Sequence, residues 1–127
     1  LGERARSTVE VGTGRPGVPR LPALPDNTDD LCRDALRAFD RDAAHRTLDT
    51  GRYRMRFSVW GNGPPLVIVH GLSDAVRGFA MVMHALAPRF TSVAYELPNG
   101  LDDGANLGTY RHTHYTADLF ALLDHLR

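Results

Sequence analysis

The sequence predicts an α/β fold, and three observations lead to that prediction. Residues 53–59 alternate apolar side chains with arginine and serine, the period-two pattern of a strand with one buried face. Residues 66–69 (Leu-Val-Ile-Val) form a continuous aliphatic run, typical of a strand in a parallel sheet covered by helices. Between this run and a second buried strand at residues 91–95, apolar side chains recur at helical spacing. Two such strands joined by a helix form a right-handed βαβ crossover.

The chain of 127 residues is long enough for one modest domain. Residues 1–27 are rich in glycine and proline, and we expect them to form a disordered tail. The domain then covers residues 28–127. Thr28 is a plausible N-cap for a short helix, because Asp29 and Asp30 follow it and favour the positive end of the helix dipole. The apolar face of this helix is expected to hold Leu31, Cys32, Ala35, Leu36 and Phe39.

A hairpin is expected next, with residues 45–49 as the partner strand and a turn at Thr50-Gly51. Its arginines, Arg52, Arg54 and Arg56, alternate with the apolar positions. They could bind nucleic acid or an acidic ligand, but a solvent-facing strand surface is the favoured interpretation. After residues 76–87, Pro88 ends the helix. Glu96 stands at the carboxyl end of the strand at 91–95, and a final amphipathic helix runs to the last residue.

Composition excludes several classes of function. The 15 basic and 15 acidic residues balance, so no net field favours nucleic acid or an anionic membrane. The single cysteine, Cys32, excludes a disulfide within the chain and a multi-cysteine metal site. No apolar run approaches the ~20 residues that span a bilayer, and residues 1–10 do not form a signal peptide. We therefore expect a cytoplasmic protein with no cofactor and no membrane partner.

The segment from Val59 to Asp74, with Pro64-Pro65, the aliphatic run and His70-Gly71, is similar to the opening of many α/β-hydrolases. The strand ending Tyr95-Glu96-Leu97-Pro98 resembles the fourth strand of that superfamily, although the family more often has Asp where this chain has Glu96. The helix ending at residues 122–126 looks like the one that leads into the nucleophile strand. The resemblance implies the N-terminal half of the fold: a mixed four-stranded sheet in order 1-2-4-3 with a helix on each face.

The resemblance also implies a role for the loop after the third strand. In acyl transfer, backbone N–H groups stabilise the oxyanion, and losing one donor costs ~3 kcal/mol of barrier lowering. In this superfamily one donor comes from this loop. Here the donor would be the N–H of Leu72, with Gly71 allowing close approach and His70 orienting the loop. The alternative is that His70-Gly71 is only a strand-ending turn.

The nucleophile is missing from the sequence. None of the four serines, Ser7, Ser58, Ser73 and Ser92, lies in a Gly-x-Ser-x-Gly turn. By superfamily order the nucleophile, acid and base would all follow residue 127, so this chain would need completion to act on a small-molecule ester. We expect it to be inactive alone.

Two other interpretations remain. The third strand would become an open apolar edge, which favours self-association or a non-catalytic binding module. His112, His114 and Asp118 weakly resemble a metal-binding pattern, but polar residues at the start of a helix are the favoured interpretation and we expect no metal site.

Overall fold

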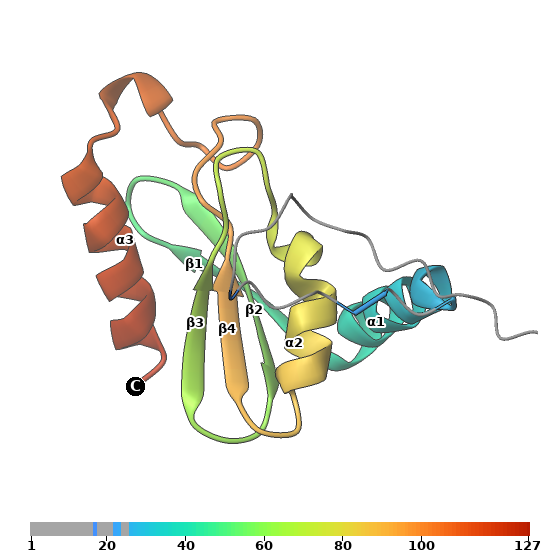
Figure 1. Cartoon of the computed structure of the whole chain (residues 1–127). Coiled ribbons are helices and arrows are strands. Elements are labelled where there is room, and N and C mark those ends of the chain that lie inside the picture. The colour runs from blue at the N-terminus through green and yellow to red at the C-terminus, as the bar shows by residue number, and fades with distance from the viewer. Residues whose placement is uncertain (1–16, 18–21, 24–25) are drawn as a thin grey trace, which may run out of the picture.

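The structure, a computed structural model, describes Gly17, residues 22–23 and residues 26–127. Most of the expected tail at 1–27 therefore lies outside the described residues. The elements in chain order are the helix α1 (Thr28–Asp42), the strands β1 (Ala44–Asp49), β2 (Arg54–Gly61) and β3 (Pro65–Val69), the 3₁₀ turn η1 (Val76–Phe79), the helix α2 (Ala80–Leu86), the strand β4 (Thr91–Tyr95), the 3₁₀ turn η2 (Leu107–Thr109) and the helix α3 (His112–His125). Figure 1 shows these elements as one α/β unit.

The four strands form one mixed sheet in the order β1-β2-β4-β3, which confirms the expected topology. β1 and β2 are an antiparallel hairpin, β2 pairs antiparallel with β4, and β3 pairs parallel with β4. The parallel pair needs a crossover, and η1 with α2 supplies it. Because β3 and β4 are parallel, their carboxyl termini lie at the same end of the sheet.

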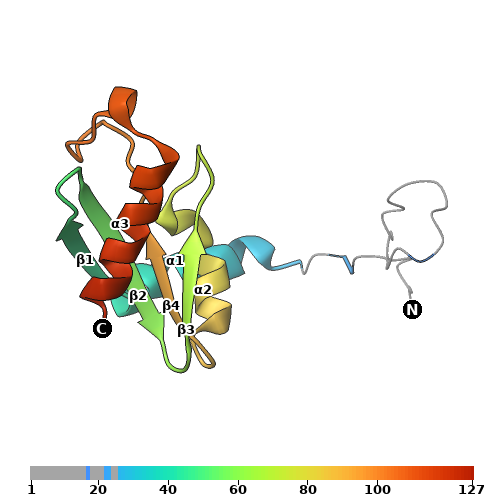
Figure 2. The ribbon, with the colours of Figure 1, turned by 90° about the vertical axis from the view of Figure 1, so that its left-hand side faces the viewer.

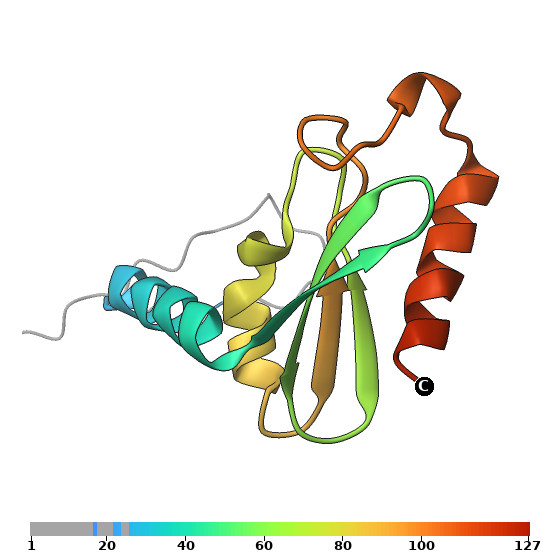
Figure 3. The same cartoon turned by 180° about the vertical axis from the view of Figure 1, so that it is seen from behind.

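Helices cover both faces of the sheet. α1 and α2 lie on one face and α3 lies on the other, as Figures 2 and 3 show from the side and from behind. Successive residues of β4 point to opposite faces, so Ala94 joins the core under α1 and α2, while Val93 and Tyr95 join the core under α3. The sheet therefore separates two small cores, each closed by its own helix layer. The buried members of the first are Phe39, Ala43, Val76, Ala80, Met83 and Ala94, and those of the second are Tyr53, Met55, Phe57, Val93, Tyr95 and Leu122.

The first helix differs from its prediction in two details. Asn27, and not Thr28, is the N-cap residue, and its side chain makes no capping hydrogen bond. Its buried side chains are Ala35, Ala38 and Phe39, whereas Leu31 is exposed. α1 lies against α2, where the Cys32 Sγ is 2.9 Å from the Met81 Sδ.

The aliphatic run in β3 is less buried than its sequence predicts. Leu66 and Val69 are exposed and Val67 and Ile68 are half-buried, so the expectation of a strand buried on both faces was wrong for this strand. The reason is position: among the described residues β3 pairs only with β4, and its other side is the edge of the sheet. An apolar edge, expected from the superfamily order, is therefore present in the structure.

The last helix ends at His125, two residues before the end of the chain, where the sequence predicts that it continues. It lies on the second core through Leu122, which is fully buried. The two helix histidines His84 and His125 are exposed, and each ring also contacts an aromatic side chain, Trp60 and Phe57 respectively.

Candidate oxyanion loop

The loop of residues 70–75 connects the carboxyl end of β3 to η1. It lies beside the segment that leaves β4, and Figure 1 shows both at the same end of the sheet. In open α/β sheets, ligands bind in the crevice outside the carboxyl ends of the strands. The predicted site residues His70, Gly71 and Leu72 therefore lie at the end of the sheet where a site is expected.

His70 is buried, and both of its ring nitrogens have partners. Nδ1 lies 2.7 Å from the carbonyl oxygen of Gly71. Because a carbonyl only accepts hydrogen bonds, Nδ1 carries the hydrogen and donates it. Nε2 accepts the N–H of Leu97 at 3.0 Å, which fits the neutral ring with its proton on Nδ1. His70 thus connects the loop to the exit of β4, and it has no free nitrogen to act as a general base.

Leu72 occupies the second position of a tight turn. The Asp74 N–H donates to the Gly71 carbonyl at 3.1 Å and closes the turn. Leu72 is 98% exposed, and its N–H makes no hydrogen bond among the described residues. An exposed N–H without an internal partner is free to bind a ligand oxygen.

Gly71 is not required by the packing of the loop. A Cβ added to it would meet nothing within 4 Å, and its φ is not in the left-handed region. Gly61 is different, because its φ is +103° and a Cβ there would collide with the carbonyl of Phe90. The glycine at 71 therefore leaves open space next to the free N–H, where another group can approach.

Glu96 is a residue of this region that the sequence did not identify as part of the site. Its Oε1 accepts the N–H of Val76 at 2.9 Å, and its Oε2 lies 3.2 Å from Nε2 of His70. The Leu97 N–H and the Glu96 carboxylate face the same ring nitrogen. Since Nδ1 carries the proton of the neutral ring, we assign the hydrogen bond at Nε2 to Leu97 and treat the Glu96 distance as a contact. An acidic residue directly after a buried strand is the sequence signal that could have identified Glu96.

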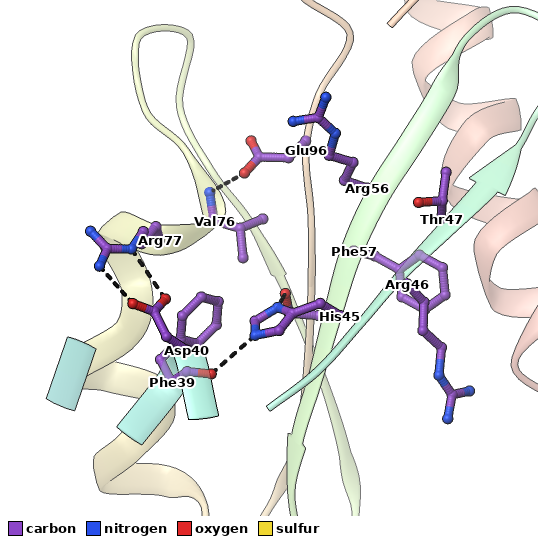
Figure 4. A pocket seen from close by; sticks show the side chains of 11 residues that line it. Phe39, Asp40, His45, Arg46, Thr47, Arg56, Phe57, Val76, Arg77 and Glu96 are labelled. Atoms are coloured by element: carbon purple, nitrogen blue, oxygen red, sulfur yellow. Dashed lines mark hydrogen bonds and ion pairs between the residues drawn. The ribbon is translucent and has the colours of Figure 1, made fainter. Parts of the chain in front are cut away.

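A cavity of about 420 Å³ lies between α1, the β1–β2 hairpin and η1, and Figure 4 shows its lining. Several of its polar groups are paired with one another. The Asp40 carboxylate binds Arg77, and Nε2 of His45 donates to the Phe39 carbonyl at 3.1 Å. Nδ1 of His45 then accepts the hydroxyl of Ser58 at 2.8 Å. His45 and Ser58 are cross-strand partners, so this pair joins α1 to the hairpin.

The remaining sequence candidates have other roles. Asp118 is 1% exposed and binds Arg52 and the Tyr110 hydroxyl, and Nδ1 of His114 accepts the Arg111 N–H. His112 is the first residue of α3, as the helix-start interpretation predicts. Across residues 26–127 and the few described residues before them, no group of three or more His, Cys, Asp or Glu side chains could hold a metal ion.

The serines also have defined surroundings. Ser73 is exposed in the candidate loop, and the buried Ser92 hydroxyl has no partner among the described residues. Ser7 lies outside the described residues. In the described part of the chain, no helix is long and apolar enough to cross a membrane.

Three groups with shifted pKa values, Tyr53, Tyr110 and Arg52, lie near the Asp118 carboxylate. Burial raises the pKa of Tyr53 and of Tyr110 above the ordinary value, and the nearby Asp118 carboxylate raises both further. The hydrogen bond to Asp118 raises the pKa of Arg52, so the guanidinium stays charged. These groups connect α3 to the hairpin turn and lie apart from residues 70–75 in the sequence.

Comparison with solved structures identifies the fold. Epoxide hydrolase VrEH1 from Vigna radiata is 26% identical, with a TM-score of 0.60, over 67% of this chain and 29% of its own. Epoxide hydrolase CorEH is 28% identical, with a TM-score of 0.60, over 67% of this chain and 30% of its own. E-2-(acetamidomethylene)succinate hydrolase is 25% identical, with a TM-score of 0.58, over 66% of this chain and 31% of its own. The chain has a partial α/β-hydrolase fold.

The partial α/β-hydrolase fold spans about three tenths of the length of the solved structures it matches. No protein-family model and no curated protein sequence matches this chain. The three solved structures named above are hydrolases of more than one kind: two epoxide hydrolases and a succinate-derivative hydrolase. The predicted fold class is therefore confirmed.

Proposed function

We propose that this chain forms the oxyanion-loop portion of a hydrolase that acts on ester-type or related bonds, and that it is inactive without a nucleophile supplied from outside the sequence. The observation that carries the proposal is the N–H of Leu72, which makes no hydrogen bond among the described residues and belongs to a residue that is 98% exposed. A preorganised N–H of this kind stabilises charge that develops on a carbonyl oxygen. The hydrolases among the structural neighbours support the same class of chemistry.

The proposed substrate is a small molecule, and the proposed compartment is the cytoplasm. The proposal needs no cofactor, because acyl transfer requires only a nucleophile, a base and oxyanion donors.

The first test is the coding sequence after Arg127 together with an assay. An apolar strand followed by a Gly-x-Ser-x-Gly-like turn would support the proposal, and the 127-residue chain alone should not hydrolyse p-nitrophenyl butyrate above the buffer rate. Turnover by the chain alone, abolished by a substitution in it, would contradict the proposed inactivity.

The second test removes the donor itself. Proline has no N–H, and it is favoured at the second position of a type I turn, so Leu72→Pro should remove the donor while the loop keeps its shape. No non-glycine residue in the described part of the chain has a positive φ, which fits that turn. In the protein that carries the nucleophile, Leu72→Pro should lower kcat by about 100-fold or more. Leu72→Ala is the matched control, because it keeps the N–H, and it should retain kcat within about threefold.

One observation favours a second candidate, a binding module without catalysis. β3 presents exposed Leu66 and Val69 at the edge of the sheet. An unpaired apolar strand edge is a template for another strand, supplied by a second copy or by a partner. If Leu72→Pro and Leu72→Ala behave identically in every assay while the edge binds a partner strand, this second candidate is correct.

A further inference from the structure

The Glu96 side chain contacts both ends of the candidate oxyanion loop. Its Oε1 accepts the N–H of Val76, which directly follows the loop, and Figure 4 shows this bond. Its Oε2 lies 3.2 Å from Nε2 of His70, which begins the loop. A single carboxylate therefore touches the two residues between which the Leu72 donor lies.

The Glu96 backbone is itself held in place from two sides. Its N–H donates to the carbonyl of Arg56 at 2.8 Å, and its carbonyl accepts the Tyr53 hydroxyl at 2.7 Å. Arg56 belongs to β2, at the centre of the sheet beside β4. The carboxylate thus extends from a rigid part of the fold into a loop that has few other contacts.

The geometry of the peptide bond connects these contacts to the donor. Gly71 C=O and Leu72 N–H belong to one planar trans peptide, so they point in opposite directions. Nδ1 of His70 donates to this carbonyl at 2.7 Å, and the Asp74 N–H donates to it at 3.1 Å. Whatever fixes the His70 ring and the turn therefore fixes the direction of the Leu72 N–H.

We propose that Glu96 is a positioning residue for the Leu72 N–H. It orients the donor by accepting the Val76 N–H directly after the loop, while its Oε2 lies against the His70 ring at the start of the loop. This inference rests on the proposed function of the loop. Glu96 does not touch the substrate, so its effect reaches the reaction only through the loop.

The test uses residue-resolved amide exchange in the 127-residue chain. Glu96→Ala should speed exchange at Val76 by at least about tenfold, because the acceptor is removed. It should also speed exchange at Asp74 by a similar factor, although Asp74 bonds to Gly71 and not to Glu96. Exchange at the Asp74 amide decides the test. If Glu96 acted only as the hydrogen-bond acceptor of the Val76 N–H, its removal would leave the exchange rate of Asp74 unchanged.

Two further variants make the result specific. Glu96→Gln keeps a carbonyl oxygen for the Val76 N–H and should restore slow exchange at both amides to within about threefold. Asp102→Ala removes an exposed carboxylate, in the loop after β4, that binds Arg56. It should leave the exchange rates of both amides unchanged. Exchange at Phe57 and Val93 in the cores should be equal in all variants, which excludes global unfolding.

Slow exchange at Asp74 in Glu96→Ala would overturn the inference, and so would failure of Glu96→Gln to restore it. In the protein that carries the nucleophile, Glu96→Ala should lower kcat by about tenfold with little change in KM, and it should have no further effect on Leu72→Pro. A different result would contradict the proposed function alone: Leu72→Pro and Leu72→Ala would have equal kcat, while the amide exchange of the Glu96 variants would remain as expected.

Discussion

The Asp118 carboxylate on α3 is bound by the Arg52 guanidinium from the turn between β1 and β2, 66 residues earlier in the chain. Nε of Arg52 donates to it at 2.9 Å, and the Tyr110 hydroxyl donates to its second oxygen at 2.6 Å. A carboxylate that is 1% exposed is stable in this position only because both of its oxygens are paired. The pair attaches the last helix to the first hairpin.

Asp118→Ala should therefore destabilise the fold. Breaking a buried pair typically costs 3–5 kcal/mol, but the Arg52 side chain is 33% exposed and regains water, so we expect about 2–3 kcal/mol. Urea denaturation measures the change in the free energy of unfolding. Asp124→Ala is the control, because its exposed pair with Arg127 should contribute less than about 0.5 kcal/mol. Equal stability of the two variants would show that the buried pair does not hold α3.

The two tyrosines beside this pair should make the fold sensitive to alkali. Burial raises the pKa of Tyr53 and Tyr110 in the folded state, so below pH ~10 their contribution to stability is fully present. As the pH rises past that value the unfolded chain loses phenolic protons that the folded chain retains, and the free energy of unfolding falls.

Urea midpoints between pH 8 and pH 11 measure this decline, and absorbance at 295 nm follows tyrosinate formation. The double variant Tyr53→Phe/Tyr110→Phe should be less stable at pH 8, because two hydrogen bonds are lost, and its stability should fall less steeply with pH. A decline as steep as that of the wild type would show that other groups cause the alkaline loss.

Substitution by alanine should lower the stability of the fold at Gly61 and leave it nearly unchanged at Gly71. Gly61 has a φ of +103°, and a Cβ there would also lie 2.8 Å from the Cα of Ala87, so Gly61→Ala should cost about 2 kcal/mol or more. Gly71→Ala points its methyl group into open space and should change stability by less than about 0.5 kcal/mol. Thermal or urea unfolding measures both. A large loss of stability for Gly71→Ala would mean that the loop packs more tightly than the structure shows.

The apolar edge of β3 should make the chain associate. Sedimentation velocity of the 127-residue chain should show concentration-dependent oligomers, and Val69→Lys should shift them towards monomer, because a charge on an exposed edge strand opposes pairing. Thr47→Lys is the control, because it adds the same charge to the opposite edge strand, β1. A wild-type chain that stays monomeric at every concentration would contradict this prediction.

Sequence patterns predicted the elements of the sheet, and the resemblance predicted their order. The alternation in residues 53–59 correctly separated the buried Met55 and Phe57 from the exposed Arg54 and Arg56. The identity of the N-cap was wrong by one residue, because Asn27 and Thr28 are adjacent and both are common capping residues. Periodicity assigns a strand and its faces, but it does not report whether that strand has a neighbour on each side, so the aliphatic run alone predicted a buried strand and the open edge of β3 was expected only from the superfamily order.

Long-range polar contacts could not be predicted from local patterns. Arg56 pairs with Asp102 and Arg52 with Asp118, and each contact joins segments far apart in the chain. The same holds for Glu96, whose contacts with His70 and Val76 exist only because β3 and β4 are neighbours. The loop residues His70, Gly71 and Leu72 were placed by their order after a buried strand, whereas their hydrogen bonds required the fold.

The contact of Cys32 with Met81 places a free thiol where α1 meets α2. Cys32 is the only thiol in the chain, and it lies on α1 where that helix faces α2. The thiol is half-buried and its Sγ donates to Sδ of Met81 at 2.9 Å, so alkylating reagents reach it from the solvent side while the contact with α2 is intact. A change in its alkylation rate between variants therefore reports a change at the contact between α1 and α2, without any engineered label.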